Sequence, residues 1–116
     1  DLKMKQSISG LRYQIVGNNN SNETLAQEGD VLTLDLKIEL LDGTICYETD
    51  SIPETIVLGR SERESGLQEA LAMMKENDKA KLILPSYLAY GLLGDSESIP
   101  PQSIIIIEVE LLNIKR

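Results

Sequence analysis

Apolar and polar residues alternate strictly over residues 32–40, the most regular part of a strand predicted at residues 31–40. Every second residue from Leu32 to Leu40 is leucine or isoleucine, and the positions between them are polar or charged. Because successive side chains of a strand point to opposite faces, this pattern predicts a strand with one buried and one hydrated face. The Asp42-Gly43 pair then favours a tight turn, so residues 44–46 are predicted to return as the second strand of a hairpin.

The apolar positions change to helical spacing after Ser65, where Leu67, Ala70, Leu71 and Met74 recur three or four residues apart. This spacing predicts one helix of about three turns that ends near Asn77. Further strands are predicted from shorter alternating or apolar segments at residues 11–15, 55–58, 79–84 and 104–115. Five to six strands with one short helix before the last two indicate an α+β fold, a sheet wrapped around a single helix.

The length of 116 residues fits one domain, predicted at residues 10–116, with residues 1–9 as a polar tail or linker. Cys46 is the only cysteine, so no intramolecular disulfide can form, and the chain contains no histidine. Structural zinc is therefore not expected, and the usual general base and imidazole-assisted nucleophiles are excluded. We expect neither a metal nor a cofactor.

The formal net charge of −8, with no cluster of basic residues, disfavours binding to nucleic acid. The longest apolar run, Ile104 to Ile107, is far too short to span a bilayer. The chain starts at Asp1 rather than Met, and residues 18–22 form an Asn-rich loop. These features favour an exported or membrane-anchored bacterial protein whose targeting segment has been removed, and we expect a monomer.

Five motifs follow one another along the chain: Leu40-Leu41-Asp42-Gly43-Thr44, Gly66-Leu67-Gln68-Glu69-Ala70-Leu71, Leu88-Ala89-Tyr90-Gly91, Ile99-Pro100-Pro101 and Val109-Glu110-Leu111-Leu112. In this order they resemble motifs of the FKBP-type peptidyl-prolyl cis-trans isomerases. The resemblance implies an FKBP-like antiparallel sheet around one short helix and rotamase activity on X-Pro bonds. It also implies a role in protein folding, with proline-containing peptides or unfolded protein segments as partners.

Such an isomerase needs no acid, base or nucleophile. Rotation about a peptide bond has a barrier of about 18–20 kcal/mol because twisting breaks amide resonance. A dry apolar pocket that binds the twisted amide better than the planar one lowers this barrier. A chain without histidine can therefore carry the activity that the resemblance implies.

Two residues match the pocket of the family directly. Tyr90 matches the tyrosine whose hydroxyl bonds a carbonyl beside the substrate proline, which makes it the candidate catalytic residue. Ile99 matches an apolar loop residue that closes one side of the pocket. Each residue has a simpler interpretation, because Tyr90 could anchor its own loop and Ile99 could serve only in packing.

Four candidate substrate-binding positions keep an apolar residue but lose an aromatic ring. Leu67 stands where the family usually has the tryptophan of the pocket floor, and Leu36 stands for a strand tyrosine. Ile107 and Cys46 each stand for a phenylalanine. Plain core packing is the alternative interpretation for all four residues, and the substitutions indicate an eroded pocket with weakened activity.

Four further candidate substrate-binding positions depart more seriously from the family pattern. Tyr47 replaces an aspartate, Glu54 replaces an aromatic residue, and Arg63 and Glu64 replace an apolar pair before the helix. Charged groups beside a proline ring admit water, which opposes catalysis by a dry site. A shift in register between Cys46 and Arg63 could instead bring the Tyr47 ring into the pocket.

Three functions therefore stay open after the sequence is read. The chain could be a prolyl isomerase of low or narrowed activity, or a non-catalytic peptide-binding or chaperone-like module with the same fold. It could also be a structural domain of a larger protein.

Overall fold

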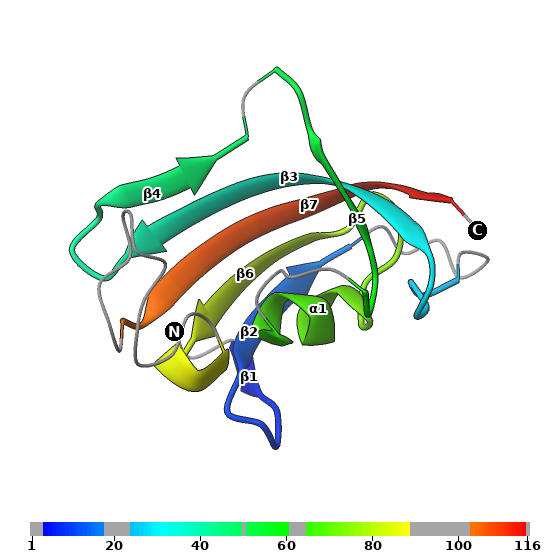
Figure 1. Ribbon diagram of the computed structural model, residues 1–116. Coiled ribbons are helices and arrows are strands. Elements are labelled where there is room, and N and C mark those ends of the chain that lie inside the picture. Colours follow the sequence, from blue (N-terminus) through cyan, green and yellow to red (C-terminus); the bar gives the residue numbers. More distant parts are fainter. Residues whose placement is uncertain (1–3, 18–23, 50, 61–64, 89–102, 116) are drawn as a thin grey trace.

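The computed structural model describes residues 4–17, 24–49, 51–60, 65–88 and 103–115 and shows a curved sheet arched over one helix (Figure 1). The first strands along the chain are β1 (Lys5–Gln6), β2 (Arg12–Val16), β3 (Val31–Leu40), β4 (Ile45–Glu48) and β5 (Glu54–Val57). They are followed by the helix α1 (Ser65–Leu71), β6 (Lys79–Leu84), the 3₁₀ turn η1 (Ser86–Leu88) and β7 (Ile105–Lys115).

The described strands form one antiparallel sheet in the order β1-β2-β6-β7-β3-β4, with β5 also paired to β3. The strands β4 and β5 share one edge of β3, because β4 pairs with residues 37–39 and β5 with residues 31–34. This arrangement confirms the predicted α+β fold with an antiparallel sheet around one short helix. The structure adds β1, which pairs with β2 and lies in the segment predicted to be a tail.

The helix α1 ends at Leu71, so the predicted length of about three turns was wrong. Beyond Leu71 the chain continues in tight turns, in which the N–H of Met73 donates to Ala70 O and that of Met74 donates to Leu71 O. Met74 is nevertheless fully buried, which explains why the apolar spacing runs past the end of the helix. Asn77 has the predicted left-handed conformation, with a φ of 74°. It lies in a turn six residues beyond the end of the helix and does not cap the helix.

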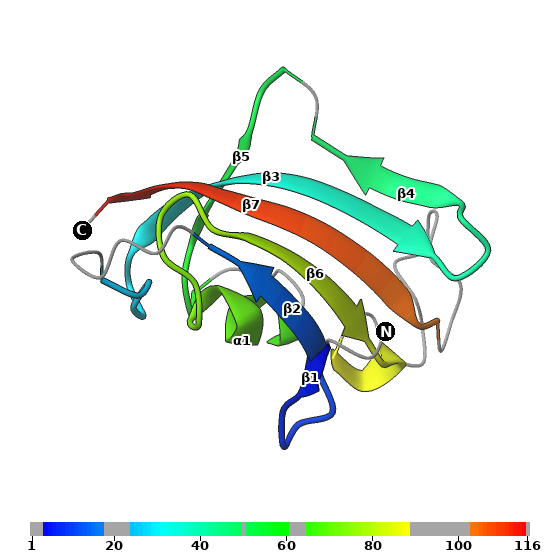
Figure 2. The same cartoon turned by 180° about the vertical axis from the view of Figure 1, so that it is seen from behind.

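The hydrophobic core lies between α1 and the sheet. Figure 2 shows from behind that α1 lies under the arch of the sheet. Leu67 and Leu71 of α1 are fully buried there, together with Ile107 near the start of β7. Gly66 allows close approach, because a Cβ atom at this position would lie 2.7 Å from Leu84 Cγ on β6. Among the described residues, no helix is long and apolar enough to cross a membrane.

Candidate active site

The apolar candidates meet on the side of the sheet that α1 covers. Leu36 of β3 is only 2% exposed, and Ile107 of β7 and Leu67 of α1 are 0% exposed, all within one core cluster. Cys46 of β4 is partly buried and packs against the same cluster. A ligand could therefore contact Leu67 or Ile107 only if neighbouring groups moved, and these side chains form the inner layer of the candidate site.

Tyr47 and Glu54 are joined by a hydrogen bond at the edge of this layer. The Tyr47 hydroxyl lies 2.7 Å from Glu54 Oε1 and donates to it. Their pairing partners on β3, Ile38 and Leu34, are both fully buried on the α1 side, so Tyr47 and Glu54 face the same side. The bond links β4 to β5, two strands that each pair with β3, and it satisfies part of the hydrogen-bonding capacity of the Glu54 carboxylate.

Thr49 is a residue of this region that the sequence analysis missed. Its hydroxyl oxygen accepts a hydrogen bond of 2.9 Å from Leu36 N, and its own N–H donates to Leu36 O at 2.9 Å. The same hydroxyl oxygen lies 3.2 Å from Asp35 Oδ1. Thr49 thus fixes the end of the β4 segment against β3 beside Leu36. The predicted return strand ended at residue 46, so there was no clear signal for this contact in the sequence.

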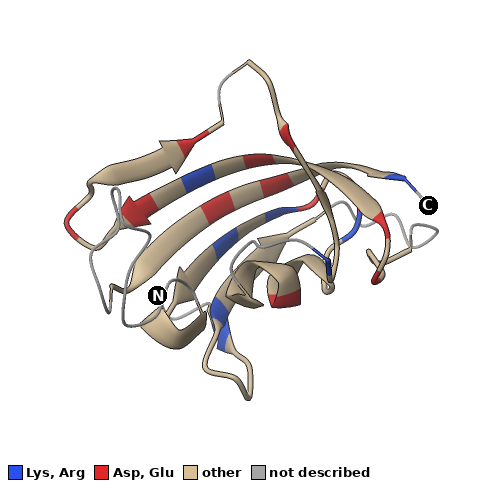
Figure 3. Cartoon of the chain, viewed as in Figure 1, with Lys and Arg blue, Asp and Glu red and all other residues tan. Residues whose placement is uncertain are grey.

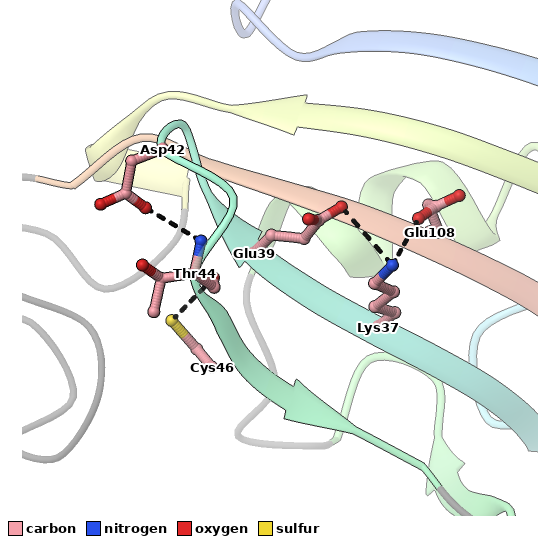
Figure 4. A network of polar contacts seen from close by, with 6 residues as sticks. All are labelled: Lys37, Glu39, Asp42, Thr44, Cys46 and Glu108. Carbon is pink, nitrogen blue, oxygen red and sulfur yellow. Dashed lines mark hydrogen bonds and ion pairs between the residues drawn. The ribbon is translucent and has the colours of Figure 1, made fainter.

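The β3–β4 hairpin holds the position of Cys46 (Figure 4). At its turn, the N–H of Thr44 donates to Asp42 Oδ1 at 2.9 Å. Two hydrogen bonds from Thr44 lower the pKa of the Asp42 carboxyl, and the bond from its side chain has a larger effect than the bond from its backbone. The ionised Asp42 carboxylate therefore stabilises the turn fully at pH values above the ordinary pKa of an aspartate. This stabilisation is lost as the pH falls through the lowered pKa of Asp42. The Cys46 thiol donates weakly to Thr44 O at 3.9 Å.

The turn η1 leads into residues 89–102 and is fixed from two directions. The Tyr87 hydroxyl donates to Ser9 O, and the Ser9 hydroxyl donates to Glu69 Oε1 on α1 at 2.5 Å. At the start of α1, the Ser65 hydroxyl donates to Leu88 O at 3.4 Å. The N-terminal segment, α1 and η1 are therefore connected directly before the loop that carries the predicted catalytic tyrosine.

Four of the predicted site residues lie outside the described residues. They are Arg63 and Glu64, before α1, and Tyr90 and Ile99, after η1. Their roles stay predictions from the resemblance. In the part of the chain that the structure describes, no group of three or more Asp, Glu, Cys or His side chains is placed to hold a metal ion.

Replacing Tyr47 with phenylalanine is expected to lower the free energy of unfolding by about 0.5–1 kcal/mol. The variant loses the hydrogen bond to Glu54 while keeping the aromatic ring, and Tyr47 is 39% exposed, which limits the effect. Urea denaturation measures the change. Tyr13→Phe is the control, because within the described ranges the Tyr13 hydroxyl makes no hydrogen bond, and a loss as large in that variant would contradict the prediction.

The comparisons with known proteins agree on one family. A family model described as FKBP-type peptidyl-prolyl cis-trans isomerase matches residues 22–112. The peptidyl-prolyl cis-trans isomerase FKBP2 of Homo sapiens is 38% identical over 96 residues, which cover 78% of this chain and 66% of that protein. FKBP9 of Homo sapiens is 32% identical over 92 residues, again 78% of this chain, but the match spans only 16% of the length of that protein.

A solved structure supports the same assignment. The crystal structure of FkpA from Escherichia coli superimposes with a TM-score of 0.88 and is 32% identical in sequence. The match covers 99% of this chain and 53% of that chain. The similarity therefore extends over nearly all of this chain but over only part of several relatives.

Proposed function

Because the chain belongs to the FKBP-type peptidyl-prolyl cis-trans isomerase family, we propose that it isomerises X-Pro bonds, with weakened activity, on the α1 side of its sheet. The observation that supports this site is the convergence of Leu36, Leu67 and Ile107 in one apolar layer. Two strands and one helix, far apart in sequence, contribute these residues. Each residue stands at a position that the family resemblance assigns to the pocket.

The proposed mechanism is differential binding of the twisted amide. The apolar layer excludes water, and the Tyr90 hydroxyl donates a hydrogen bond to a carbonyl oxygen beside the substrate proline. The proline ring packs against the aliphatic side chains, and no proton is transferred. Lowering a barrier of about 18–20 kcal/mol by even a few kcal/mol accelerates the reaction by several orders of magnitude.

Weakened activity follows from the size and accessibility of the layer. Leucine at position 67 and isoleucine at position 107 offer a proline ring less contact area than aromatic side chains would. Both side chains are fully buried, so a bound ring must first displace its neighbours. The free energy of that rearrangement is subtracted from the binding energy that could stabilise the transition state.

A second candidate function is non-catalytic peptide binding of a chaperone-like kind. It is favoured by the Tyr47–Glu54 pair, which places a carboxylate at the edge of the apolar layer instead of an aromatic ring. Together with Glu64 and Asp95, which the family resemblance places near the cleft, this carboxylate predicts a preference for basic peptides. Equal affinity for acidic and basic peptides of matched hydrophobicity would contradict this candidate.

Tyr90→Phe is expected to lower kcat/KM about 3- to 10-fold in a protease-coupled isomerisation assay on a panel of X-Pro peptides. The factor corresponds to the loss of one hydrogen bond worth about 0.5–1.5 kcal/mol in the transition state. Tyr13→Phe on β2, an equivalent loss of a hydroxyl, serves as the control and should retain full activity.

Two results would contradict the isomerase proposal. Folded protein that accelerates isomerisation of no peptide would exclude catalysis and leave peptide binding as the function. Equal activity of wild type and Tyr90→Phe, with measurable catalysis, would show that the hydroxyl of Tyr90 has no part in the reaction.

A further inference from the structure

A groove of about 590 Å³ lies on the face of the sheet that points away from α1. Its walls include outward-facing residues of β2, β6, β7 and β3, while the residues between them point into the core. The candidate active site occupies the opposite face. Leu36 and Thr49 border both the groove and the candidate site, but the charged residues of β6 and β7 that line the groove are not part of that site.

Charges in this groove are ordered along the strands. Lys79 and Lys81 of β6 form a basic row, and Glu108 and Glu110 of β7 form an acidic row beside it. The sheet register places Lys79 opposite Glu110 and Lys81 opposite Glu108. Figure 3 shows the corresponding blue positions on β6 and red positions on β7.

Much of this charge is left without a close partner. Within the described part of the chain, neither lysine of the basic row makes an ion pair, and nor does Glu110. Lys37 Nζ on β3 lies 3.7 Å from Glu108 Oε2 and 4.0 Å from Glu39 Oε1, so Lys37 forms ion pairs with both carboxylates (Figure 4). Asp35 lies directly opposite Glu110, and like charges at such positions repel each other.

We propose that the groove binds an extended protein segment in which basic and acidic residues alternate. In an extended chain, side chains two residues apart point the same way and repeat every 6.6–6.8 Å or so. The residues of the two rows are also two positions apart on their strands, so they share this repeat. A segment lying above the seam between β6 and β7, with alternate side chains turned toward each strand, directs its basic side chains to Glu108 and Glu110 and its acidic side chains to Lys79 and Lys81.

Other occupants fit the charges less well. In a two-fold pair of this chain centred on β7, the acidic rows of the two copies would face each other, and each copy carries a net charge of −8. A purely basic segment would satisfy the acidic row but would also be repelled by Lys79 and Lys81. Only a segment of alternating charge satisfies both rows at once.

The test measures binding of two fluorescent peptides of about six residues by anisotropy at low ionic strength, where surface charges are weakly screened. One peptide alternates lysine and glutamate, and the other has the same composition in two blocks. We expect the alternating peptide to bind at least about tenfold more tightly, a preference worth about 1.4 kcal/mol. The double variant Lys79→Glu, Lys81→Glu is expected to lose this preference.

The matched control is Lys5→Glu with Lys115→Glu, which changes the net charge equally but lies outside the groove lining. It is expected to retain the preference. A fourfold exchange, with Lys79 and Lys81 changed to Glu and Glu108 and Glu110 changed to Lys, reverses both rows. It should restore the preference, because the alternating peptide can shift by one residue.

Three results would overturn the proposal. They are equal binding of both peptides to wild type, tighter binding of an oligolysine of the same length, and an unchanged preference in the double variant. Isomerase activity toward X-Pro peptides, measured on the same samples, should not change in any groove variant. Failure of the groove proposal can thus be distinguished from failure of the isomerase proposal.

Discussion

Ile107→Ala is expected to lower the free energy of unfolding by about 2–5 kcal/mol, as for other truncations of large aliphatic side chains in a packed core. Ile107 is fully buried near the start of β7, where it lies between Ile38 of β3 and Leu82 of β6. Both neighbours are themselves fully buried, so little relaxation can fill the space left by the removed atoms. Chemical denaturation followed by circular dichroism gives the value.

The adjacent residue supplies the control for this prediction. Ile106 points to the opposite face of the sheet and is only partly buried. Ile106→Ala is therefore expected to cost clearly less, although the same atoms are removed from the same strand. Equal losses in the two variants would show that strand propensity, rather than core packing, accounts for the effect.

The strands could be predicted because their periodicity is strong. On β3 the alternating sequence pattern corresponds to alternating burial from Leu32 to Glu39, although Leu40 at the end of the strand is only partly buried. The length of the helix could not be predicted in the same way, since Met74 is buried from a turn and therefore extends an apolar pattern that is typical of a helix. Apolar spacing reports which side chains reach the core, whereas hydrogen bonds decide where the helix ends.

In the candidate site, the sequence could predict which residues face α1 but not how the polar ones are paired. The convergence of Leu36, Leu67 and Ile107 follows from the strand pattern, the helix pattern and the family resemblance. The bond between Tyr47 and Glu54 depends on an irregularity in the β3–β4 pairing, which sets the face to which Tyr47 points. Such an irregularity adds one residue to a strand and leaves no clear signal in the hydrophobic pattern.

Leu67→Trp is expected to lower the free energy of unfolding by about 3 kcal/mol, near the upper end for overpacked cores. This change introduces the residue that the family usually has at the pocket floor, but Leu67 is fully buried and Gly66 already brings α1 close to Leu84. Leu67→Met, which conserves volume, is the control and should cost less than about 1.5 kcal/mol. Denaturation midpoints and kcat/KM for X-Pro peptides are measured on both variants.

The two measurements together show whether the floor alone limits the proposed activity. If the layer around Leu67 is as closed as its burial indicates, the tryptophan occupies core volume and kcat/KM does not rise. A stable Leu67→Trp variant with higher kcat/KM would contradict this expectation, because the larger ring could then fit only if the site opened. In that case the loss of the ring at position 67 would by itself account for the proposed weakening of activity, and the other aliphatic replacements would be tolerated.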